Sequence, residues 1–243
     1  MKVKKADDYQ SWYISEGERA LLIDPWFDTS LVDGSGWFLQ RKKEKHSHLT
    51  KAELSLVQDI IITAPFGDHL HFNTLKSFPD ANLWCSRQVK SILKKENFKN
   101  KIFEFSSDSN LIGNLDVKVY PAGFPYNTTA SCLLVSNSDG FKIFHEGHVA
   151  NKKIISKNNI KANIAILTAE EVKFFGLLTL SMNFKSTIEV CKLLQADKLF
   201  VTGSNPLKNS GLINYFLKLK KLDKDLSADK IEIFYEAGSS YSL

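Results

Sequence analysis

The sequence predicts an α/β protein, and three patterns along the chain support that class. An apolar β-branched run at residues 60–62 ends abruptly at Thr63 and is followed by a polar cluster, which is typical of a buried strand with a loop at its carboxyl end. The first part of the chain is rich in strand patterns, whereas residues 164–235 alternate strand with helix. Two sheets covered by helices satisfy all three patterns.

The first elements are a hairpin and an irregular stretch. A turn at residues 16–18 joins two strand patterns, the second of which ends in Asp24-Pro25-Trp26. Residues 28–55 show no regular pattern. The elements expected next are a strand at 57–63, a helix at 73–78 capped by Asn73, a strand at 82–85 and a helix at 86–95 capped by Ser86.

Strand patterns continue in the middle of the chain, and helices return after them. The expected elements are strands at 101–105 and 115–120, a hairpin of 132–135 with 141–144, a strand at 164–167, a helix at 186–195, a strand at 199–201, a helix at 212–222 and a strand at 231–235. Residues 174–178 are too hydrophobic for a loop. They fit an exposed patch for a partner, a helix packed on a sheet, or a dimer contact.

Length and composition predict one domain over residues 1–243, because 43% of the residues are hydrophobic and no linker or repeat interrupts the chain. The cysteines, Cys85, Cys132 and Cys191, stand in apolar surroundings without a Cys-x-x-Cys pair, which indicates buried free thiols in a reducing compartment. No run of 18 apolar residues and no apolar signal segment is present. We therefore expect a cytoplasmic protein with no membrane partner.

The charge pattern does not favour nucleic-acid binding. The net charge is +5, but 32 basic and 27 acidic residues are interspersed along most of the chain. Two stretches, residues 41–46 and 218–221, are locally basic, and neither has interleaved aromatic residues or a recognised motif. We interpret the first as a solvated loop and the second as a solvated helix face.

Four separated segments carry a resemblance to a known family. They are Leu21-Leu22-Ile23-Asp24-Pro25-Trp26, the loop from Thr63 to His69, Phe144-His145-Glu146-Gly147-His148, and the stretch from Ile164 to Gly203. Their order and type resemble the metallo-β-lactamase superfamily, in particular its lactonase-like branch. The resemblance implies a four-layer αββα sandwich with mixed sheets and a metal-dependent hydrolase ancestry.

The residues that match this family's metal ligands are few. The family loop reads Thr-His-x-His-x-Asp-His; Asp68 and His69 match it here, whereas Ala64 and Phe66 replace its first two histidines. A complete member holds two zinc ions with five histidines and two aspartates. Residues 121–127 contain no histidine, His148 aligns with the bridging aspartate, and Gly203 aligns with the last histidine. The resemblance thus describes a divergent subgroup with most zinc ligands replaced.

The surviving residues define a candidate site. Asp68, His69 and His148 are the candidate metal ligands, and three such ligands with water suit one zinc, iron or manganese ion. In that site Asp68 also orients the attacking water and His145 donates a proton to the leaving group. The supporting residues implied by the resemblance or by closeness in sequence are Asp24, His71 and Glu146. Because side chains alternate along extended chain, only one of His69 and His71, and one of His145 and Glu146, is expected to face the site.

Two functions follow from this partial site. The first is a vestigial or non-catalytic fold that needs no cofactor and has a binding or regulatory role, with a small molecule, a protein or a second copy as partner. The second is a residual one-metal hydrolase acting on a lactone, an ester or a phosphodiester. A purely structural interpretation also exists, in which Asp68 bonds loop amides, His69 bonds Asp24, and aromatic residues fill the former metal site. These aromatic residues are Trp26, Trp37, Phe66, Phe124 and Tyr126.

Overall fold

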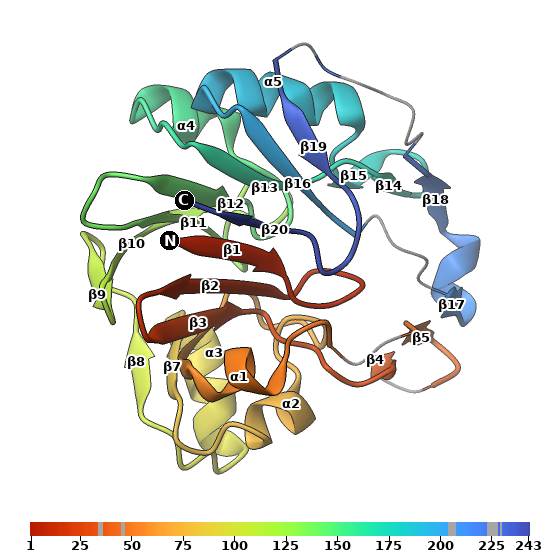
Figure 1. Cartoon of the computed structure of the whole chain (residues 1–243). Coiled ribbons are helices and arrows are strands. Elements are labelled where there is room, and N and C mark those ends of the chain that lie inside the picture. The colour runs from red at the N-terminus through yellow and green to blue at the C-terminus, as the bar shows by residue number, and fades with distance from the viewer. Residues whose placement is uncertain (34–35, 45–46, 204–207, 223–227, 229) are drawn as a thin grey trace.

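The computed structural model describes residues 1–33, 36–44, 47–203, 208–222, 228 and 230–243. Two seven-stranded mixed sheets stack on one another, and helices cover the outer face of each (Figure 1). The α/β class and the four-layer αββα arrangement expected from the sequence are confirmed.

The first sheet has the order β20-β1-β2-β3-β6-β7-β8. Its strands are β1 Lys2–Lys5, β2 Trp12–Glu16, β3 Arg19–Ile23, β6 Val57–Ile62, β7 Asn82–Cys85, β8 Ile102–Glu104 and β20 Ser240–Ser242. From β3 to β8 the neighbours are parallel, with Ile23 paired with Ile61 at the last register position of β3. The carboxyl ends of β3 and β6 therefore lie side by side.

The second sheet has the order β19-β16-β13-β12-β11-β10-β9. Its strands are β9 Asn110–Ile112, β10 Leu115–Pro121, β11 Ser131–Ser136, β12 Lys142–His145, β13 Ile164–Thr168, β16 Lys198–Thr202 and β19 Glu232–Phe234. The strands from β12 to β19 are parallel, and His145 pairs with Ile166 near the carboxyl end of β12. Both sheets thus present parallel strand ends that can carry functional loops.

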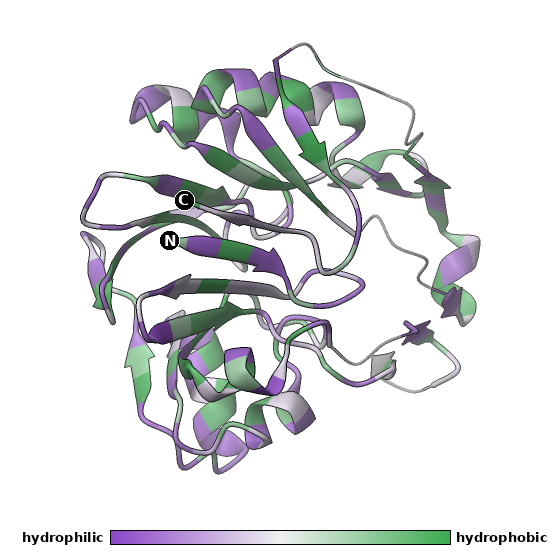
Figure 2. Ribbon diagram, in the orientation of Figure 1, coloured by the Kyte–Doolittle hydropathy of each residue, from purple (hydrophilic) through white to green (hydrophobic). Residues whose placement is uncertain are grey.

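Three apolar clusters hold the layers together. The cluster between the sheets joins Trp12 of β2 to Phe200 of β16, both fully buried, with their rings edge to face at 5.8 Å. A second cluster lies between the second sheet and its helices, and a third lies between the first sheet and its helices. Figure 2 shows the hydrophobic colour concentrated in the strands of both sheets. Cys85, Cys132 and Cys191 are buried free thiols, as predicted.

The helices are α1 Lys51–Ser55, α2 Phe72–Lys76, α3 Arg87–Lys95, α4 Lys152–Lys157 and α5 Phe184–Leu194. In the described part of the chain, no helix combines the length and the hydrophobicity needed to cross a bilayer. Ser86 caps α3 as predicted, because its side chain accepts a hydrogen bond from the Val89 amide. The cap predicted at Asn73 is wrong: α2 begins at Phe72, and its N-cap is His71, two residues before Asn73.

Two other predicted segments differ from the structure. Residues 28–55 are not irregular throughout, since they contain β4 Ser30–Asp33, β5 Leu39–Lys42 and α1. The helix predicted at 212–222 is wrong, because a 3-10 helix, η1 Leu212–Tyr215, leads into β18 Leu217–Lys220. The Leu-Lys-Leu-Lys alternation of β18 has the two-residue period of a strand, and pairing with β14 Glu171–Phe174 selects that conformation.

Two small sheets lie to one side of the sandwich, on the right in Figure 1. One has the order β15-β14-β18, with β15 spanning Leu178–Ser181, and the other has the order β17-β5-β4, with β17 spanning Lys208–Ser210. We call residues 36–44, 171–181 and 208–222 the arm. The apolar stretch 174–178 is neither a helix nor a buried contact, but the turn between β14 and β15.

Candidate functional site

The predicted site residues meet where β3, β6 and β12 end, and Asp24 organises this corner. The Asp24 carboxylate, which is fully buried, accepts hydrogen bonds from the Thr63 amide at 2.7 Å and the Thr63 hydroxyl at 2.5 Å. His69 Nδ1 lies 2.7 Å from the same carboxylate. Asp24 itself has a φ of 48°, a left-handed conformation that aspartate tolerates better than most residues. One carboxylate thereby fixes both the start of the loop and the ring of His69.

His69 and His148 contact each other directly. Their Nε2 atoms are 2.8 Å apart, and their ring centroids are 4.4 Å apart. Burial, followed by the nearby His69, holds the pKa of His148 well below its usual value. Burial also acts to lower the pKa of His69, but the Asp24 carboxylate outweighs it, so that the pKa is raised. A protonated His69 donates to Asp24 through Nδ1 and to His148 through Nε2.

Asp68 is paired with a residue that the sequence did not single out. Its buried carboxylate forms an ion pair with the guanidinium of Arg41 on β5. Burial acts to raise the pKa of Asp68, but Arg41 and then His69 outweigh it, and the pKa falls to about 2. The Asp68 carbonyl also accepts a hydrogen bond from Gln10 Nε2 at 2.7 Å. Asp68 is therefore an ionised group whose positive partner is already supplied by the chain.

Lys43 forms a second internal ion pair beside the first. Its ammonium lies 2.7 Å from Asp7 Oδ2 and donates to the Trp26 carbonyl, and both the Lys43 and the Asp7 side chains are fully buried. Arg41 on β5 and Lys43, the residue directly after β5, lie two apart and turn inward, whereas Lys42 is exposed. The interpretation of 41–46 as a solvated loop is therefore wrong for Arg41 and Lys43. Residues 45–46 lie outside the described residues. Only the inward alternation of the basic strand could have indicated these pairs.

Aromatic side chains surround the histidine pair. The Tyr126 ring stacks on His148 with centroids 4.3 Å apart, and Phe66 lies 5.4 Å from the same ring. Trp26 is fully buried, with the Lys43 ammonium 4.7 Å from its ring. The expected filling by aromatic residues does not extend to two others, since Trp37 is 67% and Phe124 74% exposed.

The remaining predicted site residues face in different directions. His145 is buried, and burial lowers its pKa to about 4 despite the opposing effect of Asp24. Glu146 accepts a hydrogen bond from the Thr168 amide at 2.5 Å. Together with burial, which has the larger effect, its carboxyl also raises the pKa of the Cys132 and Cys191 thiols, which belong to the apolar cluster between the second sheet and its helices. Burial raises the pKa of Glu146 well above its usual value.

His71 stands apart from His69. As the N-cap of α2 it accepts a hydrogen bond from the Thr74 amide through Nδ1 at 3.3 Å, and its Nε2 lies 3.5 Å from Asp28. Burial lowers its pKa. The structure therefore brings Asp24, Asp68, His69 and His148 together and places His71 in a capping position.

A metal ion does not fit the corner as it is arranged. Two imidazole nitrogens that share one tetrahedral zinc, with bonds of about 2.0–2.1 Å, are about 3.3 Å apart. The two Nε2 atoms are closer than that and contact each other, at 2.8 Å, and Arg41 holds the Asp68 carboxylate. Across the described ranges, no three His, Cys, Asp or Glu side chains are grouped so as to hold a metal ion. The donor atoms are engaged with one another.

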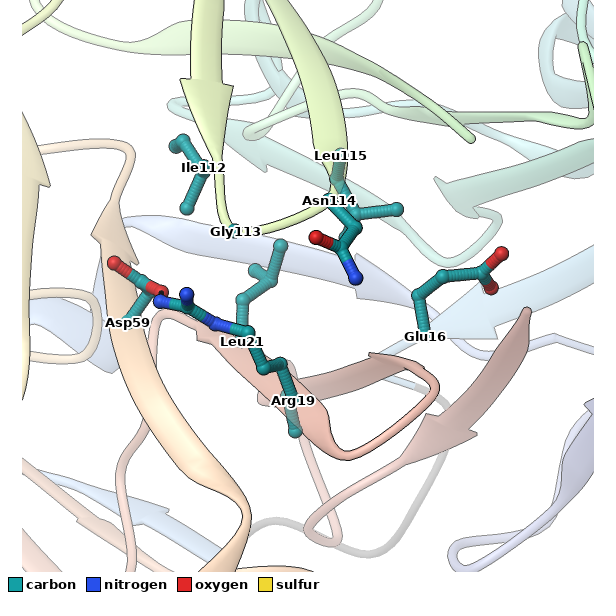
Figure 3. A pocket seen from close by; sticks show the side chains of 9 residues that line it. Glu16, Arg19, Leu21, Asp59, Ile112, Gly113, Asn114 and Leu115 are labelled. Carbon is teal, nitrogen blue, oxygen red and sulfur yellow. Dashed lines mark hydrogen bonds and ion pairs between the residues drawn. The ribbon is translucent and has the colours of Figure 1, made fainter. Parts of the chain in front are cut away.

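A small hollow at the opposite end of β3 does not offer an alternative site (Figure 3). It is lined by Glu16, Arg19, Asp59 and the turn at Gly113 and Asn114, and holds about 10 Å³, roughly the space of one water molecule. Arg19 lies 3.3 Å from Asp59, which also accepts hydrogen bonds from Asn82 and Trp84. The charged groups that line this hollow thus stabilise the end of the first sheet.

Comparison with known proteins places this chain in a family. A family model described as a beta-lactamase superfamily domain matches residues 7–201, and no curated protein matches the chain. The isothiocyanate hydrolase from Delia radicum gut bacteria has a TM-score of 0.69 at 15% identity, with 100% of this chain and 99% of that chain covered. Igni18, a metallo hydrolase from the archaeon Ignicoccus hospitalis, has a TM-score of 0.67 at 13% identity, with 100% and 98% covered.

A further similar structure is part of a larger protein. CmlA, a diiron β-hydroxylase from Streptomyces venezuelae, has a TM-score of 0.60 at 14% identity, with 83% of this chain and 44% of that chain covered. At these identities the solved structures show a shared fold, and the family model shows membership. The chain belongs to the metallo-β-lactamase superfamily.

Proposed function

We propose that this protein keeps the metallo-β-lactamase fold but works without a metal, as a non-catalytic binding or regulatory protein. One observation carries the proposal: the Arg41 guanidinium occupies the carboxylate of Asp68, while the Nε2 atoms of His69 and His148 contact each other at 2.8 Å. The atoms that would ligate a metal are satisfied by partners within the chain.

Charge balance supports the same conclusion. The Asp68 carboxylate is matched by Arg41 and the Asp7 carboxylate by Lys43, so these two buried carboxylates have cationic partners. A divalent ion would add two positive charges beside Arg41 and would have to displace it. Leaving either member of a buried pair without its partner costs about 3–5 kcal/mol. Arg41 therefore opposes metal binding and also supplies the positive charge that a metal would supply.

Thermal unfolding in the presence and absence of metal tests this proposal. Binding to the folded state raises the melting temperature by mass action, so a metal protein is stabilised by zinc and destabilised by a chelator. We expect wild-type protein to melt at the same temperature with excess Zn²⁺, Fe²⁺ or Mn²⁺, and with EDTA. A metal-dependent increase that disappears in Asp68→Ala, but persists in the control Asp28→Ala, would contradict the proposal.

A one-metal hydrolase is the second candidate, and one observation favours it. Asp68, His69 and His148 meet at one point, where the charge of Asp68 acts on both histidines. Two similar structures are named as a hydrolase and a metallo hydrolase. In this account Asp68, His69 and His148 would hold zinc, iron or manganese once Arg41 had moved away, and the chemistry gained would be activation of a bound water. His145 would donate the proton to the leaving group.

Hydrolysis assays separate the two candidates. The substrates are a p-nitrophenyl ester, a bis-p-nitrophenyl phosphodiester and an acyl homoserine lactone, each with zinc, iron or manganese added. The second candidate predicts turnover that is lost in Asp68→Ala and retained in Asp28→Ala. Our proposal predicts no turnover above that of Asp68→Ala with any metal.

A further inference from the structure

Exposed apolar side chains gather on the arm. Of the eleven large apolar residues that are exposed in the described part of the chain, seven belong to it. The most exposed are Leu177 at 88%, Tyr215 at 86%, Trp37 at 67% and Phe175 at 59%. An exposed apolar patch of this kind on a folded protein marks an interaction surface.

Three segments far apart in sequence form this surface together. The Phe175 amide donates to the Phe216 carbonyl at 2.8 Å, and the two rings lie 4.9 Å apart. The Leu212 amide donates to the Trp37 carbonyl at 2.9 Å. The turn after β14, the helix η1 and the turn before β5 are therefore neighbours, and Figure 2 shows green and purple segments alternating along them.

The three-stranded sheet of the arm is only partly covered. None of the residues of β14, β15 and β18 is buried. The register places Val172 opposite Leu219 and Phe174 opposite Leu217, so these four side chains share one face of the sheet. None of the four takes part in the three apolar clusters formed by the described residues. Leu219 is 54% exposed and the other three are partly buried, so this face leaves apolar surface available to a partner.

Charge identifies what that partner is. The arm carries six lysines, at 42, 173, 208, 218, 220 and 221, besides the inward-facing Arg41 and Lys43, and only two glutamates, Glu44 and Glu171. Lys218 lies beside Gly176 at the tip of the turn, within 3.2 Å of the position of a Cβ there. Two copies facing each other through this surface would bring like charges together, so an anionic partner is favoured over self-association.

We infer that the arm docks on an anionic lipid surface. The most exposed apolar residues lie in turns and in η1 and not along the edge strands β15 and β18, where a bound peptide would add a strand. Protruding aromatic and aliphatic tips flanked by lysines match the boundary between lipid headgroups and acyl chains. Lysines near such a surface also attract anionic headgroups. This inference departs from the expectation that the protein has no membrane partner, which considered spanning segments and signal peptides only.

Trp37 provides a built-in reporter for the test. Of the other three tryptophans, Trp12 and Trp26 are fully buried and Trp84 is partly buried and stacked on Phe103, so a change in the surroundings of the exposed Trp37 dominates any fluorescence response to lipid. The full chain is mixed with vesicles of phosphatidylcholine alone, or of phosphatidylcholine and phosphatidylglycerol at about 7:3. We expect a blue shift and sedimentation with the anionic vesicles only, both reversed at about 1 M salt, where the Debye length is about 3 Å. Trp37→Phe should remove the shift.

Matched variants distinguish vesicle binding through the arm from nonspecific adsorption. Phe175→Ser with Leu177→Ser should abolish vesicle binding, whereas Leu111→Ser, at a site 74% exposed on β9, should leave it unchanged. Lys218→Glu and Lys220→Glu should each weaken binding at least fivefold, from about 1 kcal/mol per lysine. The control Lys95→Glu, on the exposed end of α3, should not.

Two results would overturn the inference. One is the absence of binding to anionic vesicles at low salt by folded wild-type protein. The other is equal weakening by Leu111→Ser and by the Phe175–Leu177 double variant. In the first case, light scattering of the protein alone, and of its mixture with an acidic protein, would show whether the arm joins two copies or binds the acidic protein instead. Arg41 of the arm pairs with Asp68, but the substituted residues Phe175, Leu177, Lys218 and Lys220 lie on other segments of the arm, so this test does not depend on metal binding.

Discussion

The corner at the strand ends buries polar and charged groups, whereas the arm exposes apolar ones. In the corner, Asp24, Asp68 and His69 are buried and His148 is partly buried, and each has a partner within the chain. In the arm, apolar groups such as Leu177 and Tyr215 are exposed, and the strands β14, β15 and β18 contain no buried residue. The polar groups of the corner are paired within the chain, in part by Arg41 of the arm, whereas for the exposed apolar groups of the arm we propose an external partner.

This difference indicates where function resides in the molecule. A site that binds metal or substrate leaves donor atoms available, but the corner uses its donor atoms to stabilise the fold. A surface that binds a partner carries apolar side chains that contribute little to folding. Substitutions should therefore reduce stability in the corner and binding in the arm. The following predictions test that contrast, from the largest effect to the smallest.

Asp24→Ala should produce the largest loss. It removes the acceptor of hydrogen bonds from the Thr63 amide and hydroxyl and leaves His69 Nδ1 without its carboxylate. Removing one partner from a buried charged network costs about 3–5 kcal/mol. Urea unfolding followed by circular dichroism measures the change in free energy. A loss below about 1 kcal/mol would mean that the corner does not stabilise the fold.

Arg41→Ala should cost about 2–3 kcal/mol, because its partner Asp68 is buried while Arg41 remains about one-fifth exposed. A double-mutant cycle with Asp68→Asn should give a coupling of about 1–3 kcal/mol. Additive effects would show that the two side chains do not interact. The control Lys42→Ala, on the exposed side of β5, should change stability by less than about 0.5 kcal/mol.

Replacing Glu53 should have an intermediate effect on stability, and that effect should depend on pH. Burial acts to raise its pKa, but hydrogen bonds from Lys2 and Lys4 at 2.8 Å outweigh it and lower the pKa to about 2. Because the folded pKa is below the unfolded value, this contribution is present above about pH 4.5 and is lost as the pH falls toward 2. Glu53→Gln should cost about 1–2 kcal/mol at pH 7 and much less at pH 2. An equal cost at both pH values would exclude the ionic contribution.

Leu177→Ser should have the smallest effect on stability, below about 0.5 kcal/mol, because the side chain is 88% exposed. The melting temperature measures this directly. A decrease of several degrees would show that the turn packs against the protein and is not a free surface. The expectation that substitutions in the arm reduce binding and not stability would then be wrong.

Sequence patterns predicted the sandwich well because its strands are buried and strongly patterned. The run at 60–62 became β6, and the alternating units at 164–201 became β13, α5 and β16. The arm was harder to predict, because Leu217–Lys220 has a short pattern whose conformation is set by pairing with β14. Local propensity contains no information on such a long-range partner.

The candidate site was predicted in part. The Asp24, Asp68, His69 and His148 side chains do converge, and the alternation rule separated His69 from the capping His71. Arg41 was missed, because its partner Asp68 is 27 residues away and a basic run in an irregular stretch resembles a solvated loop. The ligand replacements at Ala64 and Phe66 gave no sign that a guanidinium supplies the missing positive charge.

Metal content tests the central claim most directly. Untagged wild-type protein and Asp68→Ala, purified without added metal and again after incubation with zinc, iron or manganese, would be analysed by inductively coupled plasma mass spectrometry. Our account predicts that both proteins contain the same background level of metal, well below one equivalent, in every condition. About one equivalent in wild type that is lost in Asp68→Ala would contradict it and would assign the corner to a one-metal hydrolase.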